Sequence, residues 1–238
     1  SFGARTTALD EPYEDAPKER GQLLHSNAQL RSAIRDAEKG RYQLLIHAIG
    51  DRAASQVISA FSSTLKSPTA LRHRIEHLEL PDKRGLSQMR RLGLFASMQP
   101  NFVGEWGQPG GMMEARLGKR RYMHADPFRA VLKARVPLVF GSDCMPFNPL
   151  WGIHSAVNAP FPEQKLTVGE AVAAYTRTAA FASFEENFKG TLAPKKAADL
   201  IILSEDPFRN PSRIKDIRVD ATIFDGKFVW KRPLNPVP

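Results

Sequence analysis

The feature that most constrains the fold is a short apolar segment that ends in a histidine and runs directly into a turn. It occupies residues 43–50 (QLLIHAIG), and helical spacing of apolar residues follows it. A buried strand followed by a turn and a helix is the pattern of a βα unit. Residues 74–77 (RIEH) and 136–143 (VPLVFGSD) have the same form. The sequence therefore predicts parallel strands, three of which end at His47, His77 and Asp143.

Helical and extended patterns alternate through the first three quarters of the chain. Strands are predicted at residues 43–47, 71–77, 94–98 and 136–143, with helices between them. Ser26 with Gln29, and Thr167 with Glu170, form capping boxes that predict two helix starts. Such alternation is typical of a parallel α/β sheet, and four strands are half of what a closed barrel needs. The glycine-rich residues 101–124 are predicted to form an irregular loop.

The C-terminal residues have a different pattern. Residues 198–203 and 221–230 are strand-like, and Asp225-Gly226 lies where a hairpin would turn. We therefore predict a βα region at residues 1–190 and a small β unit at residues 191–238.

The composition argues against a nucleic-acid-binding protein and against a membrane-spanning protein. The 238-residue chain carries a formal charge of +9, but its basic residues are scattered and no nucleic-acid-binding motif surrounds them. No apolar run approaches the roughly 18 residues of a membrane span, and Cys144 is the single cysteine. We expect a cytoplasmic protein with no nucleic-acid or membrane partner. Because the chain starts at Ser1 without methionine, we also expect it to come from inside a longer protein.

The three strand-terminal side chains suggest a metal site. Two neutral imidazoles and a carboxylate are a common ligand set for zinc, which lowers the pKa of bound water from 15.7 to about 7. A nearby carboxylate can accept the water's proton and deliver it to a leaving group. A histidine after an apolar run is also common as a structural residue, and Gly-Ser-Asp is an ordinary turn or helix cap. The pattern alone leaves both interpretations open.

Several motifs, in collinear order along nearly the whole chain, resemble the amidohydrolase superfamily. They most resemble its branch of YtcJ-like and N-substituted formamide deformylase-like hydrolases. The motifs are residues 1–6 (SFGART), 11–13 (EPY), 47–53 (HAIGDRA), 72–77 (RHRIEH), 97–100 (SMQP), 141–143 (GSD), 173–176 (AAYT), 189–192 (KGTL) and 198–200 (ADL).

The resemblance implies a (β/α)8 barrel beside a small β-sandwich, with one or two divalent metal ions in the intact enzyme, and zinc is the ion that we expect. His47 and His77 match its metal ligands after the fifth and sixth strands. Asp143 matches the aspartate after the eighth strand, which binds metal and acts as general acid/base. The fold expected is therefore the second half of a metal-dependent hydrolase TIM barrel plus a C-terminal β-sandwich segment.

The sequence departs from the family pattern in three places. It contains no His-x-His, and the chain begins just past the expected position of the fourth-strand ligand. Residues 194–196 (PKK) replace the family's Pro-Gly-Lys. We therefore expect this chain to carry about half of the metal site.

Three further residues are weaker candidates for the site. Asp51 either supports an imidazole or places charge at a helix N-terminus. Arg74 and Gln99 lie where substrate contacts are expected, whereas His73 is expected to be structural.

The function expected is hydrolysis of a carbon–nitrogen bond, of amide or formamide type, in a small non-peptide substrate. The alternative is a non-catalytic regulatory or binding module derived from a barrel. Because an incomplete sheet leaves strand edges unpaired, self-association is also possible.

Overall fold

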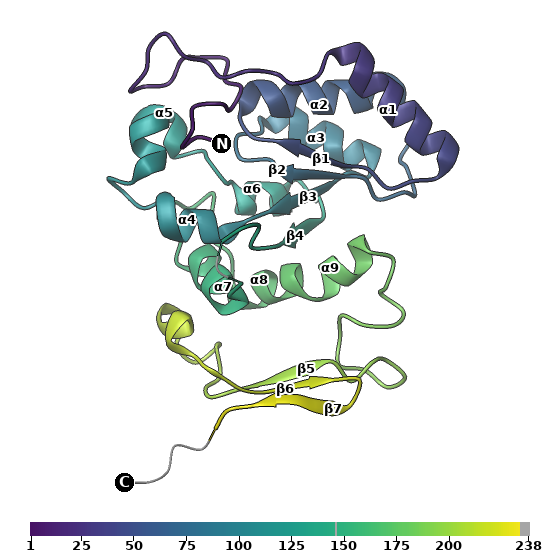
Figure 1. Cartoon of the computed structure of the whole chain (residues 1–238), viewed down its shortest axis with the longest axis vertical. Helices are drawn as coiled ribbons and strands as arrows, with labels where there is room; N and C mark the ends of the chain where they lie inside the picture. Colours follow the sequence, from purple (N-terminus) through teal and green to yellow (C-terminus); the bar gives the residue numbers. More distant parts are fainter. Residues whose placement is uncertain (146, 234–238) are drawn as a thin grey trace.

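The computed structural model describes residues 1–145 and 147–233. Its centre is a four-stranded sheet in the order β1-β2-β3-β4, with every neighbouring pair parallel (Figure 1). The strands are β1 (Leu45–Ala48), β2 (Arg74–His77), β3 (Phe95–Met98) and β4 (Leu138–Phe140). The α/β class and the parallel strands predicted from the sequence are confirmed.

Helices connect consecutive strands, as parallel pairing requires. They are α1 (Asn27–Gly40) before β1, α2 (Asp51–Thr64) and α3 (Lys83–Leu92) between the next strands, and α6 (Phe128–Lys133) before β4. After β4 come α7 (Pro149–Val157), α8 (Val168–Tyr175) and α9 (Arg177–Ala182). Both predicted capping boxes are present, at the starts of α1 and α8.

The main hydrophobic core forms where these helices pack on the sheet. Alternate strand residues contribute to it, so side chains such as Ile75, Ala96 and Leu138 belong to the helix-covered face. Phe95 and Val139 belong to a separate cluster with Ala182 of α9. The helices α1, α2 and α3 lie together on one side of the sheet, and α7, α8 and α9 lie beyond β4 (Figure 1).

The prediction of an irregular loop at residues 101–124 was wrong. This stretch forms α4 (Pro100–Trp106) and α5 (Met112–Tyr122). Pro100 occupies the first turn of α4, where proline is favoured because its missing N–H has no helical partner. Glycines lie between the two helices, and Gly118 (φ 70°) kinks α5, but buried apolar side chains of both helices form a second core cluster. Tertiary burial therefore outweighs the low helix propensity of glycine.

The C-terminal residues form a second, antiparallel sheet in the order β5-β6-β7. Its strands are β5 (Leu200–Leu203), β6 (Val219–Phe224) and β7 (Lys227–Lys231), with the short 3₁₀ helix η1 (Pro211–Asp216) between the first two. Asp225 and Gly226 both have positive φ, the conformation that a tight two-residue hairpin turn needs. The predicted hairpin is confirmed. This sheet lies apart from β1–β4, with α7–α9 between them (Figure 1).

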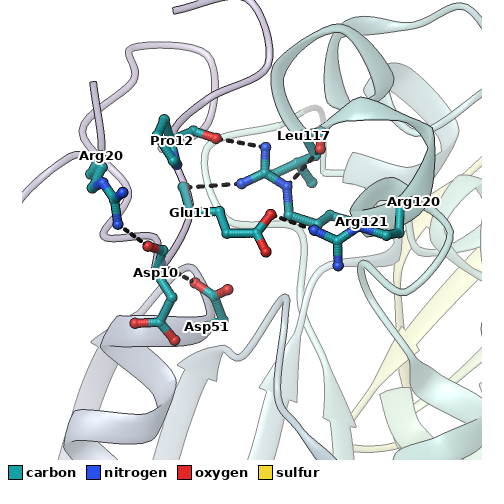
Figure 2. Close-up of polar contacts among 8 residues, drawn as sticks. All are labelled: Asp10, Glu11, Pro12, Arg20, Asp51, Leu117, Arg120 and Arg121. Carbon is teal, nitrogen blue, oxygen red and sulfur yellow. Dashed lines mark hydrogen bonds and ion pairs between the residues drawn. The ribbon is translucent and has the colours of Figure 1, made fainter. Parts of the chain in front are cut away.

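The first 24 residues run over one end of the sheet without helix or extended strand. They are nevertheless packed, since Leu9 and Tyr13 are almost fully buried. Side chains of α5 hold this segment: Arg121 donates to the carbonyls of Glu11 (3.0 Å) and Pro12 (2.7 Å), and Arg120 pairs with the Glu11 carboxylate (Figure 2). The segment is thus fixed next to the carboxyl ends of the strands. In the ranges that the structure describes, no helix has both the length and the apolar character needed to cross a bilayer.

Candidate active site

Two histidines lie side by side at the carboxyl ends of neighbouring strands. His47 is the third residue of β1, and His77 is the last residue of β2. The strand register pairs His47 with Glu76 and Ala48 with His77. The two imidazole centroids are 4.5 Å apart, with the rings at 69° to each other. Residues distant in the sequence are therefore brought together by sheet pairing.

Asp143 joins them from the turn after β4, because the strand ends at Phe140 and not at Asp143 as predicted. Its Oδ2 is 3.9 Å from Nε2 of His77. The Asp143 side chain is 44% exposed and that of His77 only 8% exposed, so the carboxylate lies at the entrance and the imidazole lies deeper. The three predicted ligand residues thus lie at one end of the sheet.

The backbone around His77 and Asp143 has an uncommon conformation. His77 (φ 71°), Leu78 (φ 50°) and Asp143 (φ 55°) all have positive φ. The N–H of Leu78 donates to the carbonyl of Glu76 (3.0 Å), which makes a γ-turn centred on His77, and also to that of Ala48 (3.1 Å). Non-glycine residues with positive φ are uncommon and often mark functional sites. At His77 the turn redirects the chain directly after the strand.

Burial keeps both imidazoles neutral at neutral pH. Burial lowers the pKa of His77 to about 4, and the neighbouring His47 adds to the decrease, while Asp143 and Gln99 act in the opposite direction. Burial is also the main cause of the lowered pKa of His47. The neutral imidazole is the form that binds a metal ion.

The three side chains carry donor atoms suited to a divalent metal ion, but these atoms lie further apart than they would around a bound ion. Over the described ranges, no group of three or more His, Cys, Asp and Glu side chains has an arrangement that could hold a metal ion. Donor atoms bound to one tetrahedral zinc at about 2.0–2.2 Å lie roughly 3.3–3.6 Å from one another. The 3.9 Å between His77 and Asp143 exceeds this by only a few tenths of an ångström. A small side-chain movement would therefore bring this pair within ligand spacing.

The weaker candidates have different surroundings. Gln99 is buried beside His77, and its Oε1 has no hydrogen-bond partner. Arg74 pairs with Glu76 on the same strand, at 3.1 Å. Asp51 accepts the backbone N–H groups of Asp10 (3.0 Å) and Arg52 (2.8 Å), so it anchors the N-terminal segment at the start of α2 (Figure 2). This favours the helix-terminus interpretation of Asp51.

His73 is structural, as expected. It is fully buried, its Nδ1 accepts the N–H of Leu44 (2.9 Å), and its Nε2 is 3.0 Å from Oε1 of Glu38. The ring therefore ties β1 to β2 at the end of the sheet opposite His77, and its backbone partner fixes the proton on Nε2.

Comparison with known proteins assigns the chain to a family. The amidohydrolase family model named Amidohydro_3 matches residues 1–230. The chain belongs to the amidohydrolase family. The putative amidohydrolase YtcJ of Bacillus subtilis is 30% identical over 98% of this chain and 46% of its own length. The N-substituted formamide deformylase of Arthrobacter pascens is 25% identical over 94% of this chain and 43% of its own length.

Solved structures of similar proteins agree with this assignment. An uncharacterized metal-dependent hydrolase from Pyrococcus furiosus superposes with a TM-score of 0.76 at 30% identity, covering 87% of this chain and 43% of the other. The corresponding protein from Pyrococcus horikoshii gives a TM-score of 0.76 at 29% identity, covering 89% and 44%. This amidohydrolase chain thus spans less than half the length of the relatives and structures compared here.

One buried carboxylate of this amidohydrolase escaped the sequence analysis. Glu79 is 2% exposed, and its Oε1 is 4.0 Å from Nδ1 of His77. Burial raises the pKa of Glu79, and burial also raises that of Asp126, whose backbone N–H donates to the Glu79 carbonyl (2.8 Å). The available signal was a glutamate enclosed by Leu78 and Leu80 directly after a strand, since a charged residue in such a position is seldom buried without a partner.

Proposed function

We propose that the protein is a metal-dependent hydrolase of carbon–nitrogen bonds, with amide- or formamide-type small molecules as substrates. His47, His77 and Asp143 would hold a divalent metal ion, with zinc as the preferred ion and one or two ions in the complete site. The observation that carries the proposal is the meeting of two neutral imidazoles and a carboxylate from three separate strand ends. A scaffold protein has no need for these three ligand types at that place. The deformylase relative acts on a carbon–nitrogen bond by its name, which supports the substrate class.

Asp143 has the position of a general acid/base. A bound divalent ion would supply a water whose pKa is lowered to about 7. The half-exposed Asp143 carboxylate can accept a proton from water at the entrance and return it to the leaving nitrogen. His47 and His77 hold their positions through strand pairing, and Phe102 stacks on His77 with ring centroids 5.9 Å apart, which keeps water from that side of the ring.

We further propose that the four-stranded sheet forms half of an eight-stranded barrel and that β5–β7 belong to a small β-sandwich. Of the predicted C-terminal unit at residues 191–238, residues 234–238 lie outside the described residues. A cavity of about 820 Å³ runs beside β1, lined by residues of β1, α1, α2 and the N-terminal segment. Leu45 of β1 is 50% exposed in this region, which leaves apolar surface for further strands to cover. Preceding strands in a longer protein would supply the remaining metal ligands.

The complete barrel matters for activity because electrostatic stabilisation of the transition state depends on a preorganised site that excludes water. We therefore expect the 238-residue chain alone to bind metal weakly and to hydrolyse little or nothing. Its open strand edges also favour homo-oligomers.

The metal site can be tested by isothermal titration with zinc, comparing the wild-type chain with His77→Ala and Asp143→Asn. His124→Ala is the matched control, because His124 is 63% exposed and pairs with Glu163 away from the site. We expect each site variant to lose at least about 10-fold in zinc affinity, since removal of even a ligand's supporting residue costs this much. Equal affinity in the site variants and the control would refute the metal assignment.

Activity tests separate the enzyme from the non-catalytic module. Amide and formamide hydrolysis would be measured for this chain and for a longer form that includes the preceding strands, each with and without zinc. Activity in the longer form that disappears in Asp143→Ala supports the proposal. Inactivity of the longer form with zinc would favour the non-catalytic module, and equal activity of both forms would show that this chain is complete in function.

A further inference from the structure

We propose that Gln99 is a specificity-determining residue: its side-chain oxygen accepts a hydrogen bond from an amide N–H, so the protein selects primary and N-monosubstituted amides over esters and N,N-disubstituted amides. The link to hydrolysis rests on the proposed function. The selective binding of an N–H group stands on the surroundings of Gln99 alone.

Gln99 follows the strand that lies between those leading to His77 and Asp143. β3 pairs with β2 on one side and with β4 on the other, and Gln99 is the first residue after β3. Its side chain lies against His77, where it opposes the decrease that burial causes in the pKa of the imidazole. A ligand group held by Gln99 would therefore lie beside His77, at the end of the sheet where Asp143 approaches the imidazole to 3.9 Å.

The Gln99 side chain does not hold the local backbone. Gln99 is the N-cap residue of α4, yet its side chain makes no capping hydrogen bond. Ser26, Asp82 and Thr167 occupy the same position before α1, α3 and α8, and each accepts a backbone N–H with its side chain. At α4 the backbone carbonyl of Gln99 accepts the N–H of Phe102 (3.0 Å) instead. The carboxamide is thus available for a contact other than capping.

The carboxamide oxygen of Gln99 is a buried acceptor. Gln99 is only 5% exposed, and its Oε1 has no hydrogen-bond partner. The buried ring of Phe102 stacks on His77 with centroids 5.9 Å apart, which limits the access of water from that side. A buried acceptor without a partner destabilises a protein, and native structures almost always pair such groups. We therefore expect a ligand to bring the donor.

Among the proposed substrates this donor is the amide N–H. An N-monosubstituted amide and an ester of the same chain length share the carbonyl and differ in the N–H. A site that hydrogen-bonds a substrate N–H rejects an analogue without it, because the buried acceptor is then left unpaired. If Gln99 instead presented its NH₂ group to the ligand, it would bind the shared carbonyl and would not distinguish the two. Comparison of an amide with its ester therefore tests which group Gln99 presents.

The experiment measures binding of N-propylformamide and propyl formate to the longer form that includes the preceding strands. Metal-free protein is used so that metal-dependent hydrolysis consumes neither ligand. NMR titration gives both dissociation constants, and the nitrogen-15 signals of the Gln99 side chain, assigned by their loss in Gln99→Met, report the contact. We expect the formamide to bind about 10-fold more tightly than the formate in the wild type, since one hydrogen bond is gained.

Gln99→Met keeps an unbranched side chain of similar length but removes the acceptor, so the affinity ratio should fall to about one. Gln88→Leu is the matched control, because Gln88 lies on α3, which covers the side of the sheet with α1 and α2 (Figure 1). The ratio in this control should equal that of the wild type.

Equal affinity of the wild type for the two ligands would overturn the inference, and this result needs no variant to fold. It is also the result expected if another part of a longer protein supplies a donor to Gln99. An unchanged ratio in Gln99→Met, or failure of the wild type to bind the formamide, would overturn the inference as well. Selective binding without hydrolysis after zinc is added would refute the proposed function and leave the role of Gln99 supported.

Discussion

The pairing of Glu170 with Arg129 can be tested as a determinant of stability in the segment that follows Asp143. Glu170 closes the capping box at the start of α8, and both its oxygens accept from the Arg129 guanidinium of α6, at 2.7 and 2.6 Å. Glu170→Gln keeps a side chain that suits the capping box but removes the charge. We predict that this variant lowers the free energy of unfolding at pH 7 by about 1–1.5 kcal/mol.

The magnitude follows from the pKa of Glu170 and its exposure. Hydrogen bonding to Arg129 is the main cause that lowers this pKa from 4.5 to about 2. A shift of roughly 2.5 units corresponds to at most about 3.4 kcal/mol. The two side chains are 34% and 24% exposed, so water screens the pair and the expected contribution is less than half of that limit.

The assay is urea unfolding of the wild type and Glu170→Gln at pH 7, 5 and 3.5. Because the folded pKa is lowered, the stabilisation is fully present above about pH 4.5 and is lost as the pH falls towards 2. The stability difference should therefore be equal at pH 7 and 5 and smaller at pH 3.5. Glu185→Gln is the control, since the Glu185–Lys189 pair is exposed and should contribute about 0.5 kcal/mol or less. A difference that does not exceed the control, or that is the same at pH 3.5 as at pH 7, would refute the reasoning.

Three other outcomes are expected. Gly50→Ala should lower the free energy of unfolding, measured with urea, by at least about 2 kcal/mol, because Gly50 has φ 96° and an added Cβ would lie 2.4 Å from the Ala8 carbonyl oxygen. Gly141→Ala is the control, because a Cβ there meets open space, and it should change the free energy of unfolding less. Arg72→Ala should accelerate amide hydrogen exchange at Phe184, because Arg72 donates to Glu186 from both Nη1 and Nη2 and stacks over the Phe184 ring at 4.2 Å. Unchanged exchange would contradict this. In an NMR titration His77 should remain neutral from pH 8 to 5 and take up a proton only near pH 4, because burial lowers its pKa; a midpoint above pH 6 would contradict the burial argument.

Much of the fold could be predicted because local sequence and tertiary structure agree. The four strands, both capping boxes and the Asp225-Gly226 turn each have a local signal, and the structure has all of them, although β1 runs to Ala48 and β4 ends at Phe140 instead of at the predicted Asp143. The helices α4 and α5 could not be predicted from glycine content. Their stability comes from the core cluster in which Phe102 of α4 and Met113, Leu117 and Tyr122 of α5 pack with the N-terminal segment, which is a contact between distant parts of the chain.

The site shows the same division between local and distant information. Each of His47, His77 and Asp143 could be singled out because it lies near the end of an apolar strand or shortly after it. Glu79 has only the weak signal of a glutamate between two leucines, because its approach to His77 depends on two consecutive residues with positive φ, and neither His77 nor Leu78 is a residue type that signals such a turn. The sequence could not decide whether Asp51 supports an imidazole or lies at a helix N-terminus, because its partner, the Asp10 N–H, lies on a segment without regular structure.

The spacing of His47 and His77 is set by backbone hydrogen bonds between neighbouring strands, whereas the packing beside them comes from Phe102 of α4, which stacks on His77 and belongs to the core cluster that joins α4, α5 and the N-terminal segment. These two parts of the molecule can therefore change independently during evolution. Substitutions in α4 can alter the surface next to the imidazoles while the strand register keeps the two histidines in place. In the proposed hydrolase, one ligand geometry would in this way serve several substrates.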